Sequence, residues 1–121
     1  MSPPIKPLYW VGSARRDLLA MPADVIDTFG YALHLAQEGK KHAQAKPLRG
    51  FGGAGVLEVV EDHAGDTYRA VYTVKSPEGI YVLPCFQKKS RQGTATPRQD
   101  IELVTERLKR VLAQIEGARN D

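Results

Sequence analysis

The stretch YRAVYTVKSPEGIYVLPCFQKK, residues 68–89, decides the fold of this chain. Two apolar segments flank the turn residues Ser-Pro-Glu-Gly at 76–79, and this pattern predicts two neighbouring antiparallel strands. The first segment carries Arg69 near its start, and the second ends in the pair Lys88 and Lys89. Permanent cations are costly in apolar strands unless an anion comes to meet them. The three cations therefore suggest a phosphate-bearing ligand; the alternative is that they are ordinary solvated strand residues.

The hydrophobic pattern on either side of this hairpin predicts one α+β domain over residues 1–121, with helices packed against an antiparallel sheet in the order β-α-α-β-β-β-α. Its first two helices are expected to form an antiparallel hairpin and its last three strands a meander. The chain is predicted to begin with a strand at 5–11, which Pro7 pushes towards a sheet edge, followed by a short helix capped by Ser13 and a longer helix opened by Pro22. A polar, basic connection then runs from Lys40 to Gly55. Strands follow at about 56–61, 67–75 and 79–87, and Pro97 opens the final helix.

The two longer helices each show one apolar stripe at helical spacing. Gly39 is expected to end the earlier of them as a C-cap residue. Thr96 and Gln99 are expected to form a capping box at the start of the later one. The stripe residues are Val25, Ile26, Phe29, Ala32, Leu33 and Ala36 in the earlier helix, and Ile101, Val104, Leu108, Val111 and Ile115 in the later one.

Composition indicates a soluble protein. The chain has 121 residues, of which 42% are hydrophobic and 26% charged, as is usual for a globular domain with its own core. Its single cysteine, Cys85, rules out an internal disulfide framework and indicates a reducing compartment. No apolar run reaches the length of a membrane span, and the N-terminus lacks a signal pattern. We therefore expect a cytoplasmic protein with no membrane association.

The positive charge is concentrated in the middle of the chain. Residues 40–98 hold ten basic and five acidic groups, whereas residues 1–39 and 99–121 each carry one more acidic than basic group. The net charge of +3 therefore comes entirely from the predicted sheet region and the connection before it. A basic surface of this kind favours a nucleic-acid partner or an acidic protein partner.

Three further features of the sequence could be sites of chemistry. The stretch GFGGAG at 50–55 matches G-x-G-x-x-G, but a loop precedes it and a strand follows it, so we expect a sharp turn rather than a dinucleotide site. His34, His42 and His63 are scattered and lack partners at metal-ligand spacing, so no metal site is expected. Cys85 lies in an apolar strand, where a thiol is usually inert.

Strand alternation divides the cations between two faces of the sheet. Arg69 shares a face with Val71, where its guanidinium could hold a phosphate by two parallel hydrogen bonds. Lys88 and Lys89 point to opposite faces if their strand stays regular, so only one of them can lie beside Arg69. The sequence alone leaves open which one. Lys46, in the basic connection, could border the same surface once the connection folds back.

The order of five short segments is similar to that of a known family. They are KPLRG at 46–50, VLEV at 56–59, YRAVY at 68–72, FQKKS at 86–90 and TP at 96–97, ahead of a helix. In this order they resemble the phage-derived, HigB-like toxins of the RelE superfamily. The resemblance extends over nearly the whole chain, and the combination is more specific than any one segment.

This resemblance implies a small RelE-like α+β toxin of a type II toxin–antitoxin pair. Such toxins enter the ribosomal A site and cut mRNA there, without a metal or cofactor. The ribose 2′-hydroxyl attacks the adjacent phosphate, which requires a proton acceptor, cations for the developing phosphorane and a proton donor for the leaving oxygen. The expected partners are mRNA, the ribosomal A site and a cognate antitoxin of the helix-turn-helix type.

The resemblance also implies roles for individual residues. Arg69 matches the strand arginine that stabilises the transition state in relatives. Lys88 and Lys89 match the basic strand end that contacts phosphate or supplies the acid. Lys46 matches the basic connection that grips RNA or helps to activate the hydroxyl, and it completes the predicted catalytic set. The predicted RNA-binding residues around that set are Lys41, Arg49 and Arg91.

The chain departs from several relatives after Lys89. The segment SRQGT at 90–94 contains no tyrosine or histidine where some members place a catalytic one, so the proton donor stays open. Two alternatives therefore remain, a gyrase-inhibiting toxin on the same fold and a degenerate toxin kept as an antitoxin-binding protein. On the cleavage hypothesis, exchange of Arg69 for alanine is expected to abolish growth inhibition and to leave the fold intact.

Overall fold

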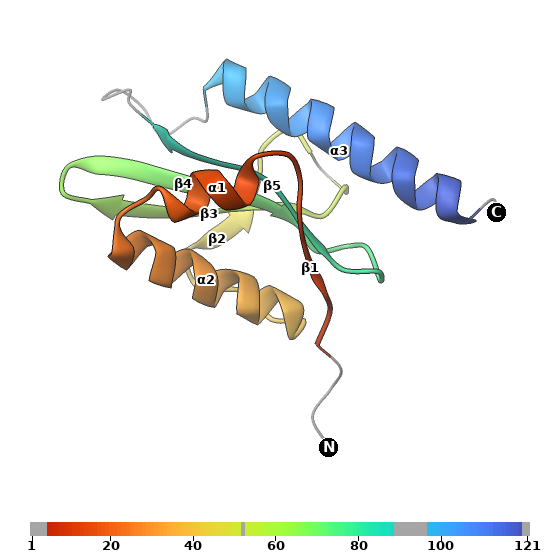
Figure 1. The fold of residues 1–121 in the computed structure, drawn as a ribbon, viewed down its shortest axis with the longest axis horizontal. Coiled ribbons are helices and arrows are strands. Elements are labelled where there is room, and N and C mark those ends of the chain that lie inside the picture. Colours follow the sequence, from red (N-terminus) through yellow and green to blue (C-terminus); the bar gives the residue numbers. More distant parts are fainter. Residues whose placement is uncertain (1–4, 52, 89–96, 120–121) are drawn as a thin grey trace.

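A five-stranded sheet with helices packed on both faces forms the body of the structure, a computed structural model that describes residues 5–51, 53–88 and 97–119 (Figure 1). The predicted α+β class is confirmed, and the described residues contain one strand more than expected. In chain order the elements are β1 (Leu8–Trp10), α1 (Ala14–Leu19), α2 (Ala23–Gln37), β2 (Ala45–Pro47), β3 (Val56–His63), β4 (Asp66–Thr73), β5 (Ile80–Lys88) and α3 (Arg98–Arg119).

The sheet is mixed rather than wholly antiparallel. Its strand order is β1-β5-β4-β3-β2, and β3, β4 and β5 form the predicted antiparallel meander. β1, however, pairs in parallel with the start of β5, with Leu8 opposite Ile80. The prediction of a purely antiparallel sheet was therefore wrong at this edge. This pairing brings together the first and the last strand of the chain, and a local sequence pattern cannot predict a contact between such distant residues.

The basic connection also contains a strand that was not predicted. β2 pairs antiparallel with β3 and places Lys46 directly opposite Glu58. A three-residue strand ending in Pro47 has too few residues to show alternation, which explains why the sequence pattern missed it. Proline is tolerated here because β2 is an edge strand, and the same holds for Pro7 beside β1.

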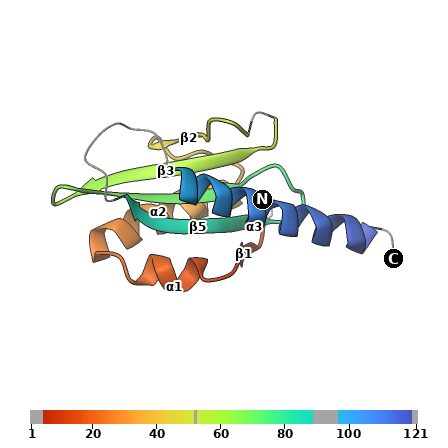
Figure 2. The same ribbon diagram turned by 90° about the horizontal axis from the view of Figure 1, so that it is seen from above.

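Two hydrophobic cores lie on the two faces of the sheet. α1 and α2 cover one face and run in opposite directions, as the predicted hairpin requires, while α3 covers the other (Figures 1 and 2). None of the described helices combines the length and the apolar character needed to cross a membrane. The core under α1 and α2 includes Val25, Phe29, Leu33, Val59, Tyr72 and Val82, and the core under α3 includes Val71, Tyr81, Leu83, Val104, Leu108 and Val111.

The described helix ends lie where the sequence pattern predicts them, but Ser13 does not make the expected capping hydrogen bond. Gly39 has φ of +80° and its N–H donates to the carbonyl of Ala36 at 3.0 Å, so it ends α2 as predicted. Ser13 lies at the N-cap of α1, but its hydroxyl makes no cap bond and donates instead to Asp17 Oδ2 at 2.6 Å. The capping box predicted for α3 depends on Thr96, which lies outside the described residues.

β5 contains one extra residue relative to β4. Tyr72 pairs with Val82, but Ala70 pairs with Cys85, so two steps along β4 face three steps along β5. Pro84 lies inside this bulge. β5 is flanked by other strands, and a proline inside a sheet is largely confined to bulges and edges because it has no N–H to donate.

This bulge changes which face each later side chain occupies. Val82 and Cys85 both belong to the core under α1 and α2, although they are three residues apart. Leu83 belongs to the core under α3, and Phe86 packs against that same core. Lys88, two residues beyond Phe86, therefore points to the α3 face.

Candidate functional site

A cluster of charged residues lies on the α3 face of the sheet, at the end where α3 begins. Four strands each supply one member, because cross-strand partners and alternate residues in a strand share a face. We call this set, together with one residue from the first turn of α3, the charged cluster. Its members are Lys46 of β2, Glu58 of β3, Arg69 of β4, Lys88 of β5 and Asp100 of α3.

The centre of the cluster is a buried ion pair. Arg69 Nη1 donates to both carboxylate oxygens of Glu58, at 2.9 Å to Oε1 and 2.9 Å to Oε2. The side chains are only 3% and 5% exposed. A cation in this apolar strand is indeed met by an anion, and Glu58 of the same chain supplies it. Arg69, which was predicted to hold a phosphate, donates through Nη1 to the Glu58 carboxylate, and phosphate binding by its guanidinium stays a prediction.

Lys46 is the exposed member of the cluster. Its Nζ lies 3.9 Å from Glu58 Oε1, and its side chain is 58% exposed. At this distance and exposure the attraction contributes little to stability, because water screens the two charges. Lys46 is therefore able to turn towards an incoming anion while Arg69 holds the carboxylate of Glu58.

The bulge decides which lysine of the pair lies beside Arg69. Lys88 pairs with Thr67 and shares the face of Arg69, and it is only 6% exposed. On a regular antiparallel ladder, diagonal neighbours of this kind lie about 7–8 Å apart. Of the two predicted catalytic lysines, Lys88 is thus brought to the site. Lys89 lies outside the described residues, and so does the predicted RNA-binding residue Arg91.

Asp100 adds a second carboxyl group to the cluster from the first turn of α3. Burial raises the pKa of Asp100, and the nearby positive charge of Arg69 opposes that rise. From the sequence pattern Asp100 is expected only as a helix residue, with no functional role. Its position over Arg69 depends on how α3 crosses the sheet, which no local signal reports.

Glu58 is the functional candidate that sequence reasoning missed. A signal was present, since Glu58 is a lone acid inside the apolar strand VLEVV at 56–60 and is 4% exposed. A buried acid in a strand requires a partner of opposite charge, just as a buried arginine does. Considering both strands together would have paired Glu58 with Arg69.

The two remaining predicted RNA-binding residues are surface residues that flank β2. Lys41 and Arg49 are both exposed, and they stand before and after β2 in the chain. Their part in binding RNA remains a prediction.

The chemistry open to the cluster follows from its groups. Glu58 supplies a carboxylate that can accept a proton; Arg69 and Lys46 contact it, and Lys88 lies on the same face. Asp100 and Lys88 are the described members that could return a proton to a departing oxygen. This arrangement suits a reaction in which negative charge develops on a phosphate next to a hydroxyl that loses its proton.

Cys85 lies on the opposite face and takes no part in this site. It is 3% exposed, and burial together with the charge of Asp17 raises the pKa of its thiol to about 12, against the opposing effect of Arg107. At pH 8 the thiolate fraction should be on the order of a thousandfold below that of an unperturbed thiol. The expectation of an unreactive thiol is consistent with this environment.

We therefore expect Ellman's reagent to modify Cys85 in the folded protein more slowly than in guanidinium, by a factor on the order of 100 or more. Because the folded pKa lies above the unfolded value, stability from this group is present below about pH 9 and is lost as the pH rises towards 12. Equal labelling rates for folded and unfolded protein at pH 8 would contradict the assignment of an inert thiol.

Comparison with protein families gives one match. The model of the family described as phage derived protein Gp49-like (DUF891) matches residues 16–109. All five members of the charged cluster fall inside that stretch. Neither the comparison with curated proteins nor the comparison with solved structures found a match.

Proposed function

The chain belongs to the Gp49-like family of phage-derived proteins, a family associated with toxin–antitoxin modules, and from this premise we propose that it is a HigB-like, ribosome-dependent mRNA endoribonuclease. The single observation that carries the proposal is the charged cluster, with the buried Glu58–Arg69 pair at its centre. A carboxylate held among cations meets the chemical requirements of RNA cleavage by the 2′-hydroxyl. Its partner is an antitoxin that neutralises the toxin until growth has to be arrested.

In the proposed reaction Glu58 is the general base. Its carboxylate accepts the proton of the ribose 2′-hydroxyl, and the 2′-oxygen forms a bond to the adjacent phosphorus. The bond from phosphorus to the 5′-oxygen then breaks, leaving a 2′,3′-cyclic phosphate and a 5′-hydroxyl end. Asp100 or Lys88 returns a proton to the leaving 5′-oxygen, so the proton balance closes.

The cations act on the charge that develops at phosphorus. Arg69 holds Glu58 in place through Nη1, and Lys46 and Lys88 flank it on the same face. Fixed positive charges near a phosphorane stabilise the transition state more than the ground state. Because Lys46 is the exposed member, RNA reaches the cluster from the side of β2.

The test is a primer-extension map of cellular mRNA after brief induction of the wild type, Lys46→Ala and Lys109→Ala. Lys46→Ala is expected to reduce cleavage within translated codons on the order of 10- to 100-fold, because one cation is lost from the transition state. Lys109 is an exposed lysine of α3, so Lys109→Ala removes the same charge away from the cluster. It should cut like the wild type.

Three outcomes would contradict the proposal. Growth arrest with intact mRNA and accumulated DNA breaks would instead indicate a gyrase-inhibiting toxin. Normal growth with intact mRNA would indicate a degenerate, antitoxin-binding protein. Equal loss of cleavage in Lys46→Ala and Lys109→Ala would remove the charged cluster from the mechanism.

A further inference from the structure

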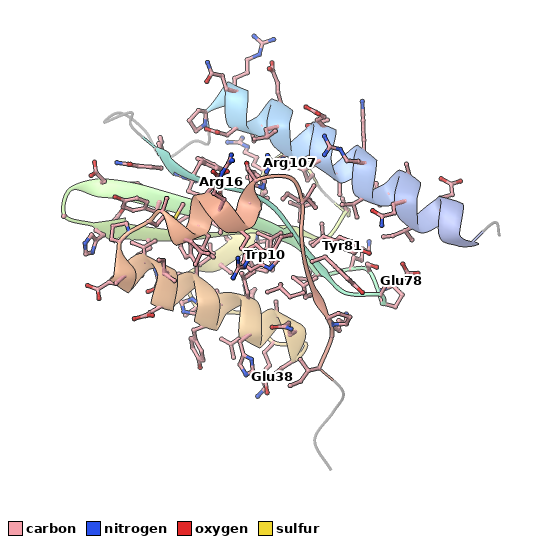
Figure 3. The ribbon with its side chains drawn as sticks, in the orientation of Figure 1. Trp10, Arg16, Glu38, Glu78, Tyr81 and Arg107 are labelled. Carbon is pink, nitrogen blue, oxygen red and sulfur yellow. The ribbon has the colours of Figure 1, made fainter. Side chains whose placement is uncertain are left out.

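Arg107 of α3 is a buried cation that lies outside the charged cluster. It is 8% exposed and lies between α3 and the start of α1 (Figure 3). Its Nη1 donates to the carbonyl oxygen of Leu83 at 2.6 Å, and its Nη2 donates to Ser13 Oγ at 3.2 Å. Gly12, with φ of +57°, makes room for it, since a Cβ there would lie 3.0 Å from Arg107 Nη2.

The bond to Leu83 is made at the bulge of β5. Pro84 offers no N–H at this point, and β1 pairs with β5 only from Ile80 to Val82. A charged donor makes a stronger hydrogen bond to a buried carbonyl than a neutral donor does, so Arg107 stabilises the bulged backbone at Leu83.

The bulge in turn decides the face of Lys88. Without the extra residue, side chains beyond Pro84 would change faces, and Lys88 would point into the apolar core that contains Cys85. A lysine there would be buried without an anion, which is strongly unfavourable. The end of β5 therefore either keeps the bulge or separates from β4.

We propose that Arg107 is a positioning residue that holds the β5 bulge and so keeps Lys88 beside Arg69. The consequence for catalysis rests on the proposed function, whereas the effect on strand pairing does not. Arg107 touches none of the reacting groups in this proposal and acts only through the Leu83 carbonyl. Its second bond, to Ser13, orients the guanidinium and links it to Asp17 of α1 through the Ser13–Asp17 bond.

The experiment measures strand pairing and RNA cleavage separately in Arg107→Met, Arg107→Lys and Ser13→Ala. Nuclear Overhauser contacts between Thr67 and Lys88 and between Arg69 and Phe86 report the pairing beyond the bulge. Contacts between Tyr72 and Val82 report the pairing before it. Cleavage is measured by primer extension as above.

In Arg107→Met we expect the contacts beyond the bulge to weaken or vanish while the Tyr72–Val82 contact stays, together with a loss of cleavage of about tenfold or more. Arg107→Lys, which can still donate to Leu83, should restore the pairing in part. Ser13→Ala should keep the pairing, since it removes only the orienting bond.

Unchanged pairing beyond the bulge in Arg107→Met would overturn the proposal, whatever happens to cleavage. If Arg107→Met does not fold, Arg107→Lys and Ser13→Ala decide. If Ser13→Ala loses the β4–β5 pairing beyond the bulge and Arg107→Lys does not keep it, the hydrogen bond to Leu83 does not hold the bulge. If the wild type cuts no mRNA, the proposed function fails, yet the pairing measurements still decide the role of Arg107.

Discussion

Arg69→Ala is expected to lower the free energy of unfolding by about 3–5 kcal/mol, because it removes the arginine that holds the buried carboxylate of Glu58. The two side chains are 3% and 5% exposed, so solvent screens this charge very little. The loss is a large fraction of the stability of a domain of this size. The earlier expectation that Arg69→Ala leaves the fold intact therefore changes once burial is known.

Urea denaturation followed by circular dichroism measures this loss. The matched control is Arg98→Ala, which removes an arginine from an ion pair with Glu102 whose side chains are 92% and 66% exposed. An exposed pair of this kind contributes at most about 1 kcal/mol, so Arg98→Ala should unfold close to the wild type. Similar losses in the two variants would contradict a buried pair at the centre of the cluster.

A double variant, Glu58→Leu with Arg69→Met, separates stability from chemistry. Replacing both members of a buried pair by apolar side chains is often neutral or stabilising, so most of the loss in Arg69→Ala should be recovered. Toxicity should nevertheless be absent, because both the base and its cation are gone. A stable double variant that still arrests growth would exclude the pair from function.

Glu58→Gln is expected to reduce mRNA cleavage on the order of 10²- to 10⁴-fold, the usual contribution of a general base. Glutamine keeps the size of the side chain and one oxygen that can accept a hydrogen bond from Arg69, but it cannot take the hydroxyl proton. Cleavage is measured in a purified translation reaction, at a temperature where circular dichroism shows the variant to be folded.

Glu61→Gln is the matched control for this exchange. Glu61 lies on the same strand, but it pairs with Tyr68, whose ring belongs to the core on the opposite face. It should retain cleavage within a few-fold of the wild type. If folded Glu58→Gln also cuts at nearly the wild-type rate, then Glu58 only holds Arg69 and another group accepts the proton.

Much of the fold could be predicted because its signals are local. The apolar stripe from Val25 to Ala36 predicted α2, and Gly39 marked its end. The turn at 76–79 and the flanking apolar segments predicted the β4–β5 hairpin. Arg69 and Lys46 were also chosen from short segments, and both belong to the charged cluster.

The sequence by itself thus determined the α+β class, the main helices and the meander, because hydrophobic periodicity and turn residues act over a few neighbouring positions. Only the tertiary structure decided that β1 pairs with β5, that Glu58 is an anion beside Arg69, and that Lys88 lies on their face. These features depend on contacts between residues far apart in the chain. For Lys88 they depend on a single extra residue, since one step along a strand turns every later side chain to the other face.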